Sequence, residues 1–428
     1  MADEPYCLVL SGGGAKGVFH IGAWRALKEL GIPVNAFVGN SIGAIMAAFL
    51  ADGKDAALEE IGRTITVDNI VKLPEGFKEN GVIKLVPAKF PRLGELYRGL
   101  ADKKGLDTSP MRKALETFLD ETSIRNSGKD LGLVTVNVSD MKPRELFIEE
   151  MEQGKLIDYL MASSAFPGFE RPEIAGKKYI DGGFWDNIPY AMARKRGYRK
   201  LIVIDISGAG INRRPDIAGS DTIYIRNSLD MGGPLDFNRH FLDSFNLLGY
   251  LDTMRVFGRY KGYNFFIDPD DMLETRFRDF LTSDSKTFTK TSPQRKTARF
   301  PEQMRYDRNL LLKYLECAAL ILGVERIKVY TYETLAAAIS IRQTTEDRRL
   351  LENAGAATTH EKNHGLETLI RASLRSKTFE ECPYFLVRTL NATVSGRTRS
   401  ILKRMLHSFW PSLDAGLLYI QMAERFWV

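Results

Sequence analysis

Short apolar runs alternate with glycine turns and helical spacing near the start of the chain. Residues 7–11 form an apolar run that ends at glycines, which predicts a buried strand. Apolar positions three or four residues apart predict a helix over 17–30. Residues 35–38 predict a second strand, and 42–50, apolar on all sides, predict a buried helix. This alternation is typical of a parallel α/β sheet.

The same signals continue farther along the chain. The apolar runs 131–138 and 201–206 predict strong strands, and 222–226 predicts a weaker one. Helical spacing appears over 110–119 and again over 306–322. The first part of the chain therefore carries the pattern of an α/β domain, whereas the last part is mostly helical in pattern.

The domain organisation follows from these shifts in pattern. Residues 5–207 are expected to form the α/β core, and 208–285 to continue it with connecting elements. Residues 286–300 are polar and basic, which predicts a loop or linker, and 301–428 is expected to be a helical C-terminal region. Residues 68–105, rich in Gly, Pro and Lys, predict a surface excursion from the core.

Composition narrows the class of protein. The chain has 428 residues, 44% of them hydrophobic, with a net charge of +6, which excludes wholesale disorder and a disulfide-stapled miniprotein. Three cysteines far apart in sequence exclude a CxxC motif and indicate a reducing compartment. The basic residues form no dense stripe, so no nucleic-acid partner is expected.

The sequence shows only weak signals for export or for insertion into a membrane. The N-terminus is acidic where a signal peptide is basic, and no apolar stretch approaches the ~18 residues of a membrane span. We therefore expect a cytoplasmic protein without a signal peptide or transmembrane helix, whose membrane contact, where it occurs, is peripheral.

The first candidate site is the glycine run Gly12–Gly17, between the first strand and its helix. A GxGxxG pattern fits it, but a dinucleotide site needs an acid about 20 residues on, and 34–39 contains none. Backbone amides of consecutive glycines could instead form an oxyanion hole. A plain strand-to-helix turn is the third interpretation, and the run alone does not decide among them.

The second candidate is Gly39-Asn40-Ser41-Ile42-Gly43, a GxSxG between a strand and an apolar helix. Such a sequence predicts a nucleophile elbow, in which flanking glycines permit the sharp turn that exposes a serine hydroxyl. The alternative is that Ser41 is only the N-cap of the helix.

The third candidate is Asp181-Gly182-Gly183. A carboxylate here could act as general base for Ser41 if it lies within hydrogen-bond reach, whereas the alternative is an ordinary Asp-Gly turn. A Ser-His-Asp triad is disfavoured, because the late His407 follows no strand and His20 fits a structural place on the first helix.

The combination of these motifs resembles the patatin-like phospholipase family, whose members carry a glycine-rich loop, then GxSxG, then DG[GA]. Residues 162–167 resemble the ASxAxP stretch of that family, and Asn187 and Pro189 also fit. The resemblance covers about 5–207. Lys16 stands where plant members often have arginine and bacterial-type members commonly have lysine, so the resemblance is to the bacterial type.

The resemblance implies a three-layer α/β/α patatin-like sheet and lipid acyl hydrolysis through a Ser–Asp dyad without metal or cofactor. Ser41 would be the nucleophile, Asp181 the general base, and the amides of Gly12, Gly13 and Gly14 the oxyanion hole. Lys16, Gly17, Gly39, Asn40, Gly43, Gly182 and Gly183 would support these motifs.

The expected activity is hydrolysis of (lyso)phospholipid carboxylic esters, with a lipid substrate and a transient membrane surface as partners. A neutral-lipid lipase or acyltransferase with the same dyad is an alternative. Alternatives of another class are a nucleotide-binding module and a membrane-damaging effector gated by a regulatory partner of the C-terminal region. Residues 382–413 carry basic residues beside one apolar helical face, which suits either an anionic bilayer or packing on the core.

Overall fold

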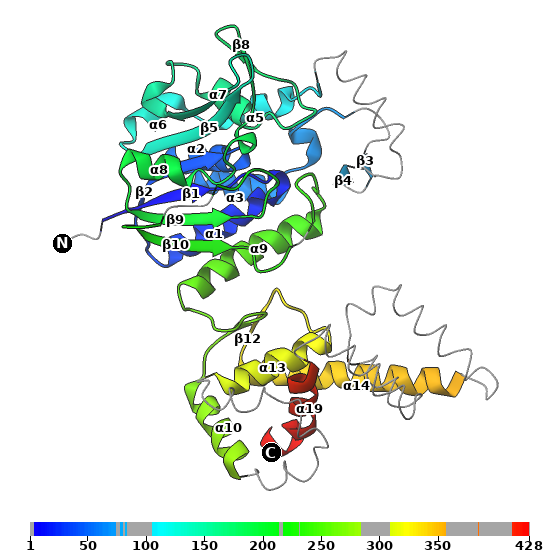
Figure 1. The fold of residues 1–428 in the computed structure, drawn as a ribbon. Coiled ribbons are helices and arrows are strands. Elements are labelled where there is room, and N and C mark those ends of the chain that lie inside the picture. The colour runs from blue at the N-terminus through cyan, green and yellow to red at the C-terminus, as the bar shows by residue number, and fades with distance from the viewer. Residues whose placement is uncertain are drawn as a thin grey trace. The chain divides into compact units, whose positions relative to one another are not determined.

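The computed structural model describes residues 4–73, 78–79, 82–83, 105–213, 217–230, 232–283, 309–356, 384 and 413–427. The chain divides into two compact units, Met1–Phe257 and Gly258–Val428 (Figure 1). The first unit is α/β and the second is mainly helical. This confirms the predicted fold class of an α/β core with a helical C-terminal region.

The first unit is built on an eight-stranded mixed sheet. Its strands are β1 Tyr6–Leu10, β2 Val34–Asn40, β5 Asp130–Asn137, β6 Lys142–Phe147, β7 Glu173–Ile174, β8 Lys177–Asp181, β9 Lys200–Asp205 and β10 Asp221–Arg226. Strands β10, β9, β1, β2 and β5 are parallel neighbours in that order. Strands β6 and β8 run antiparallel to β5, and β7 runs antiparallel to β8.

Strand β5 brings two distant strand ends together. Along one edge it pairs with β6 from Gly132 to Asn137. Along the other edge, β2 pairs up to Asn40 opposite Val134, and β8 pairs from Asp181 opposite Thr135. Because β6 already occupies one edge, β2 and β8 lie end to end along the other. Their carboxyl ends therefore meet at successive residues of β5.

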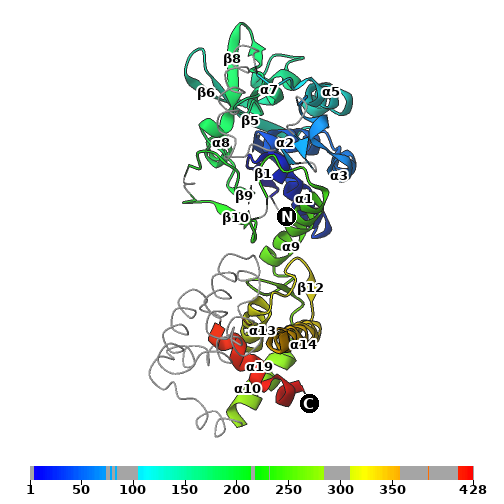
Figure 2. The same cartoon turned by 90° about the vertical axis from the view of Figure 1, so that its right-hand side faces the viewer.

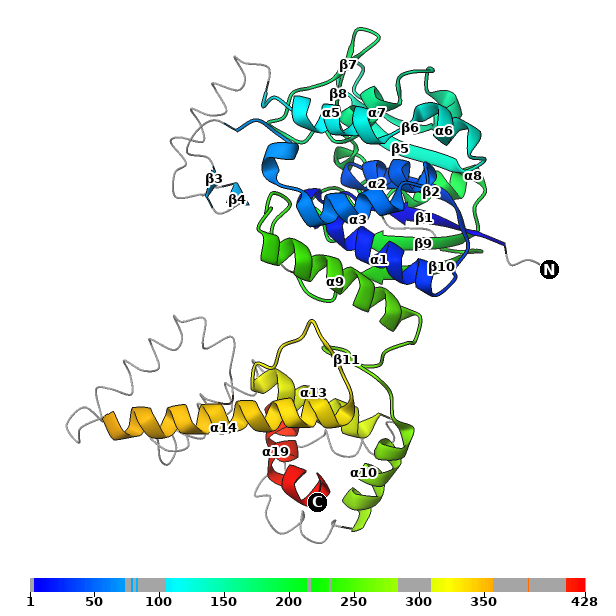
Figure 3. The same cartoon turned by 180° about the vertical axis from the view of Figure 1, so that it is seen from behind.

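Helices cover both faces of this sheet. They are η1 Gly14–Gly17, α1 Val18–Glu29, α2 Ile42–Ala51, α3 Asp55–Thr64, η2 Val67–Asn69, α5 Ser109–Phe118, α6 Glu121–Asn126, η4 Ile148–Glu150, α7 Leu156–Ser163, η5 Gly182–Phe184, α8 Tyr190–Arg196 and α9 Arg239–Val256. Cys7 and Val9 of β1 pack in one core cluster with α8. Leu8 and Leu10 point to the opposite face, where α1 and α2 lie (Figures 2 and 3).

Helix α9 has no counterpart among the predicted elements. Its signal is nevertheless present, since Phe241, Phe245 and Leu248 recur at helical spacing and are buried. It packs closely against α1 at Gly22, where an added Cβ would lie 1.8 Å from the carbonyl oxygen of Asn246. Only a residue without a side chain permits this approach.

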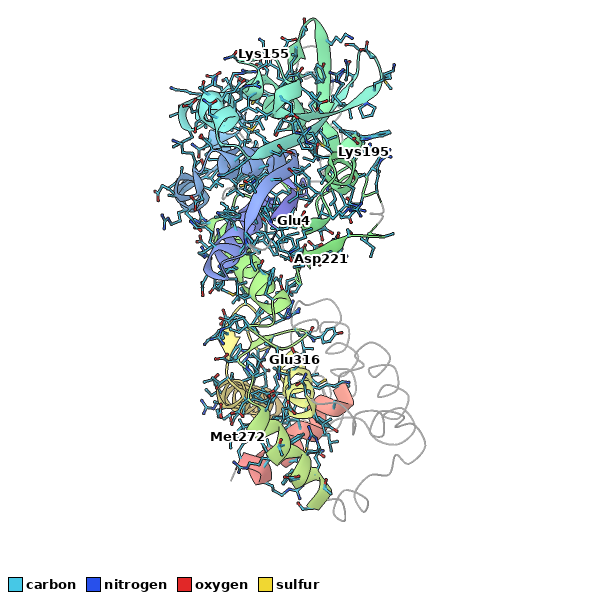
Figure 4. All side chains as sticks on the ribbon, turned by 90° about the vertical axis from the view of Figure 1, so that its left-hand side faces the viewer. Glu4, Lys155, Lys195, Asp221, Met272 and Glu316 are labelled. Carbon is cyan, nitrogen blue, oxygen red and sulfur yellow. The ribbon has the colours of Figure 1, made fainter. Side chains whose placement is uncertain are left out.

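The second unit contains α10 Asp271–Ser283, α13 Leu310–Ile321, α14 Tyr332–Ala356 and α19 Leu413–Trp427, with a short parallel pair formed by β11 Phe266–Ile267 and β12 Val329–Tyr330. Glu316, labelled in Figure 4, lies in α13. Its carboxylate accepts the amides of Tyr263, Asn264 and Phe265. This contact closes the loop before β11 onto α13.

The division between the units falls after Phe257, within the segment 208–285. Beyond it, Phe265 and Phe277 belong to the same buried cluster as Leu311 and Leu315 of α13. The domain bounds expected from the sequence stay a prediction.

Several sequence predictions lie outside the described residues. The linker 286–300 and the late His407 are among them, as is the basic segment 382–413 apart from Tyr384 and Leu413. Of the excursion 68–105, the described part includes η2 and a small hairpin, β3 Lys78–Glu79 and β4 Val82–Ile83. Within the described part of the chain, no helix has the length and apolar character to cross a bilayer.

Candidate active site

The turn between β2 and α2 places Ser41 in a strained conformation. Its backbone has φ 53° and ψ −126°, a region that costs a non-glycine residue about 1–3 kcal/mol. Glycine flanks the turn for steric reasons, since a Cβ at Gly43 would lie 2.2 Å from the carbonyl oxygen of Leu10. Although Ser41 occupies the N-cap position, its side chain makes no capping hydrogen bond. Capping therefore does not account for this serine.

A buried serine holds the turn in place. The backbone amide of Ser41 donates to Oγ of Ser163 at 2.9 Å. Ser163 ends α7 and is fully buried. Sequence reasoning placed Ser163 in the 162–167 stretch without giving it a role, because a side-chain-to-backbone contact across 122 residues leaves no local pattern.

The Asp181 carboxylate lies beside Ser41 because β8 ends where β2 ends. It accepts hydrogen bonds from the Gly183 amide at 2.8 Å and from Nδ2 of Asn40 at 3.3 Å. The bond from Gly183 is that of an Asp-Gly turn, so Asp181 is both a turn residue and a neighbour of the serine. Burial raises the pKa of Asp181 above its ordinary value, and the nearby polar groups of Ser41, Gly183 and Asn40 oppose that rise.

Two asparagines link the carboxylate to the glycine run. The buried Nδ2 of Asn40 also donates to Oδ1 of Asn187 at 3.2 Å. Nδ2 of Asn187 in turn donates to the carbonyl of Gly12 at 3.4 Å. Gly182 makes room for Asn40, since a Cβ there would lie 2.3 Å from its Oδ1. The sequence singled out Asn40 and Asn187 as motif residues, but not this bridge.

The glycine run supplies fewer free amides than expected. The Gly12 amide already donates to the carbonyl of Asn187 at 3.1 Å, which corrects its assignment to an oxyanion hole. Within the described residues, the amides of Gly13 and Gly14 have no acceptor, and both residues line the same cavity as Ser41. They are the candidate oxyanion donors that this structure leaves.

Contacts of Lys16 and Gly17 hold the glycine run in position. The buried Lys16 donates through Nζ to Asp230 at 2.8 Å and to the carbonyl of Ser207 at 3.4 Å. A Cβ at Gly17 would lie 2.3 Å from Cγ1 of Ile42, so glycine lets the run approach the start of α2. Neither residue lies among the polar groups beside Ser41.

Ser41 and Asp181 open onto a cavity of about 690 Å³. Within the described lining, Asp181 is the one charged side chain and no histidine is present. His20 lines a separate, smaller cavity, and burial lowers its pKa to about 3. The described residues also contain no cluster of three His, Cys, Asp or Glu side chains suited to a metal ion.

Residues 8–194 match the family described as patatin-like phospholipase. The match covers less than half of the chain, so it shows a similarity to that family over this segment. It includes the glycine run, the Ser41 turn and Asp181.

Curated relatives share this segment at low identity. The lysophospholipase NTE1 of Cryptococcus neoformans is 28% identical over 205 residues, which are 46% of this chain and 11% of the relative. The patatin-like phospholipase domain-containing protein 6 of Homo sapiens is 27% identical over 210 residues, covering 48% of this chain and 14% of the relative. The patatin-like phospholipase segment is thus a small part of each relative.

Two solved structures show a weak likeness over nearly the whole chain. VipD from Legionella pneumophila has a TM-score of 0.38 and 16% identity, covering 97% of this chain and 92% of that one. ExoU from Pseudomonas aeruginosa, solved with SpcU, has a TM-score of 0.29 and 14% identity, covering 98% and 78%. Both TM-scores are low, and nothing about the site is inferred from them.

Proposed function

We propose that this protein hydrolyses carboxylic ester bonds of phospholipids or lysophospholipids, with Ser41 as nucleophile and Asp181 as general base. The observation that carries the proposal is that both side chains line the same apolar cavity, with the Asp181 carboxylate held by Asn40, the residue next to Ser41. The likeness of residues 8–194 to the patatin-like phospholipase family supports a lipid substrate. A buried carboxylate beside a strained serine is the arrangement that nucleophilic catalysis needs.

In the proposed acylation step, Oγ of Ser41 attacks the ester carbonyl while Asp181 accepts the hydroxyl proton. The negative charge that develops on the carbonyl oxygen is stabilised by the amides of Gly13 and Gly14, each such donor being worth about 10²–10³ in rate. The tetrahedral intermediate collapses as Asp181 passes the proton to the leaving alcohol. The products of this step are an acyl-Ser41 ester and the free alcohol.

In the proposed deacylation step, Asp181 removes a proton from water, which attacks the acyl-Ser41 ester. Collapse of the second intermediate returns the proton to Oγ of Ser41 and releases the fatty acid. The burial that raises the pKa of Asp181 makes its carboxylate a stronger base than an exposed one. Asn40 keeps this carboxylate turned toward the serine.

Two further expectations stay proposals. A peripheral encounter with a membrane fits a lipid substrate, because the chains of the lipid must reach the cavity. Within the described part of the protein, no helix could span a bilayer. Membership of the bacterial type is supported by Lys16 at the position where that type commonly carries lysine.

A fluorophosphonate probe and phospholipid vesicles test the dyad together. We expect Ser41→Ala to abolish probe labelling and to lower fatty-acid release by roughly 10³-fold or more. Asp181→Asn should lower release by about 10²–10⁴-fold, the usual contribution of a general base. Ser123→Ala, on the exposed surface of α6, is the matched control and should behave as the parent. Labelling or release that survives Ser41→Ala would refute the assignment.

The same assay separates the lipid classes. Release from phospholipid vesicles, lysophospholipid micelles and triacylglycerol emulsions is measured side by side, with a monoacylglycerol acceptor added in a parallel reaction. Transfer of the acyl group to that acceptor would indicate an acyltransferase, and preference for the emulsion would indicate a neutral-lipid lipase.

A further inference from the structure

The cavity beyond Ser41 is apolar over most of its wall. One face of α2 contributes Ile45, Met46 and Phe49, and one face of α5 contributes Met111, Leu115 and Phe118. On each helix these positions recur three or four residues apart, so they share a face. The two faces form walls of one cavity and present hydrocarbon to it.

Polar groups gather at the end of the cavity that holds Ser41. Besides Ser41 and Asp181, this end includes Asn187, which is joined to Asp181 through Asn40. Thr64 and Asn69 also line the cavity, but they bond to their own segments: the Thr64 hydroxyl donates to the Glu60 carbonyl, and Oδ1 of Asn69 accepts the amide of Thr66. The polar groups that could take part in a reaction therefore lie at the end of the cavity that holds Ser41.

No lysine or arginine lines the cavity within the described residues. A phosphate group taken inside would lose its hydration without gaining a cation, which is strongly unfavourable. An acyl chain gains by entering, because each buried methylene is removed from water. The lining thus selects the hydrocarbon end of a lipid and excludes its charged end.

The size of the cavity is sufficient for hydrocarbon of this kind. A volume of about 690 Å³ has room for a long acyl chain beside Ser41.

An aromatic pair lines the cavity at a distance from Ser41. With a rise of about 1.5 Å per residue, Phe49 lies about 10 Å along α2 from its first residue, Ile42. Its ring packs on that of Phe118, at the end of α5, with the centroids 6.3 Å apart. Phe49 is buried, whereas Phe118 is 40% exposed, so the pair extends from the protein interior to the surface.

We propose that the cavity between α2 and α5 is a binding site for a single long unbranched acyl chain, and that the Phe49–Phe118 pair sets the length of chain that it accepts. The head group stays outside. For the identity of its substrate this proposal rests on the proposed function, which it deepens by naming the part of the lipid that is recognised.

The test narrows the cavity with one added ring. Ala114 lies on the lining face of α5, so Ala114→Phe fills the space between the helices. Thr117→Phe adds the same ring to the exposed side of α5 and is the matched control. The measurement is kcat/KM for p-nitrophenyl esters of four to sixteen carbons, with thermal unfolding of each variant recorded in parallel.

We expect kcat/KM of the parent to rise by up to about fourfold per methylene until the chain fills the cavity. Ala114→Phe should lower the ratio of the sixteen-carbon to the four-carbon ester by at least about tenfold. Thr117→Phe should leave that ratio within about twofold of the parent. Phe118→Ala should move the preferred chain to greater length. A ratio in a folded Ala114→Phe variant equal to that of the parent would overturn the proposal.

A binding experiment separates failure of this proposal from failure of the proposed function. The probe is parinaric acid methyl ester, a neutral fluorescent chain, titrated into the Ser41→Ala protein. Binding that Ala114→Phe weakens and Thr117→Phe does not supports the chain site even if the parent hydrolyses no ester. Ester hydrolysis by the parent together with probe binding that is equal in all three variants contradicts the chain site alone.

Discussion

The Asp181 carboxylate lies in a buried place that favours its protonated form. Burial raises its pKa above the ordinary 3.8, even though the nearby polar groups of Ser41, Gly183 and Asn40 act to lower it. In the unfolded chain this carboxyl ionises at its ordinary pKa. Between the two pKa values the native state binds more protons, so the contribution of this group to stability falls as pH rises through that window and is constant above it.

This sign gives a prediction for Asp181→Asn. The variant keeps an oxygen acceptor for Gly183 but carries no charge, so its stability should lose that pH dependence. We expect the unfolding temperature of the variant, relative to the parent, to increase as pH is raised from 4 to 8, while activity is lost. The measurement is thermal unfolding across that range. Asp243→Asn, at an exposed carboxylate in α9, is the control, and an equal trend in it would contradict the prediction.

At the scale of single residues, the sequence motifs identified the residues of the site but not the contacts that those residues make. Ser41 and Asp181 line the same cavity, and their catalytic roles stay predictions. The amide of Gly12 was misassigned because its acceptor, the Asn187 carbonyl, is 175 residues away. Ser163 was left without a role for the same reason. Hydrogen bonds across such distances depend on packing, which no local pattern records.

At the scale of secondary-structure elements, the site depends on β2 and β8 ending beside each other on one edge of β5. Asn40 and Asp181 lie opposite Val134 and Thr135, so two segments far apart in sequence end beside each other. Apolar runs predicted the parallel strands, because buried parallel strands are apolar throughout. Strand β8, with two lysines at its start, lacks that signal, and its register could not be predicted.

The close approach of α2 to β1 gives a prediction for Gly43. A Cβ at this position would lie 2.2 Å from the Leu10 carbonyl oxygen, and neither backbone can move without displacing the Ser41 turn. We expect Gly43→Ala to lower the free energy of unfolding by about 1–3 kcal/mol or more and to reduce fluorophosphonate labelling.

The control is Gly233→Ala, where an added Cβ meets nothing within 4 Å. Chemical denaturation and labelling of both variants are measured together. Equal stability of the two variants would show that the steric argument at Gly43 is wrong.

At the scale of the molecule, different described residues form the hydrophobic cores of the two units. The cluster around β1 and α8 lies within the first unit, and the cluster around α13 lies within the second. Composition and periodicity predicted this change from α/β to helical structure. They gave no sign of which core Phe265 and Phe277 would join, because an apolar residue can pack in either one.

Separate cores give a prediction for the fragment 1–257. We expect it to unfold cooperatively and to be labelled at Ser41 by a fluorophosphonate, because the described lining of the cavity lies within these residues. Circular dichroism, thermal unfolding and labelling test this. A fragment that is folded but unlabelled would show that the second unit is needed for the site. A change in turnover relative to the full chain would support the effector hypothesis.

The described residues that line the cavity all lie in one unit, and this has a consequence for how such proteins evolve. A pocket assembled entirely by its own segment can be joined to different neighbours by gene fusion without redesign of its interior. The relatives fit this picture, since a comparable segment occupies about a tenth to a seventh of their much longer chains. In such an arrangement, the segment that carries the site and the domains beside it can evolve independently.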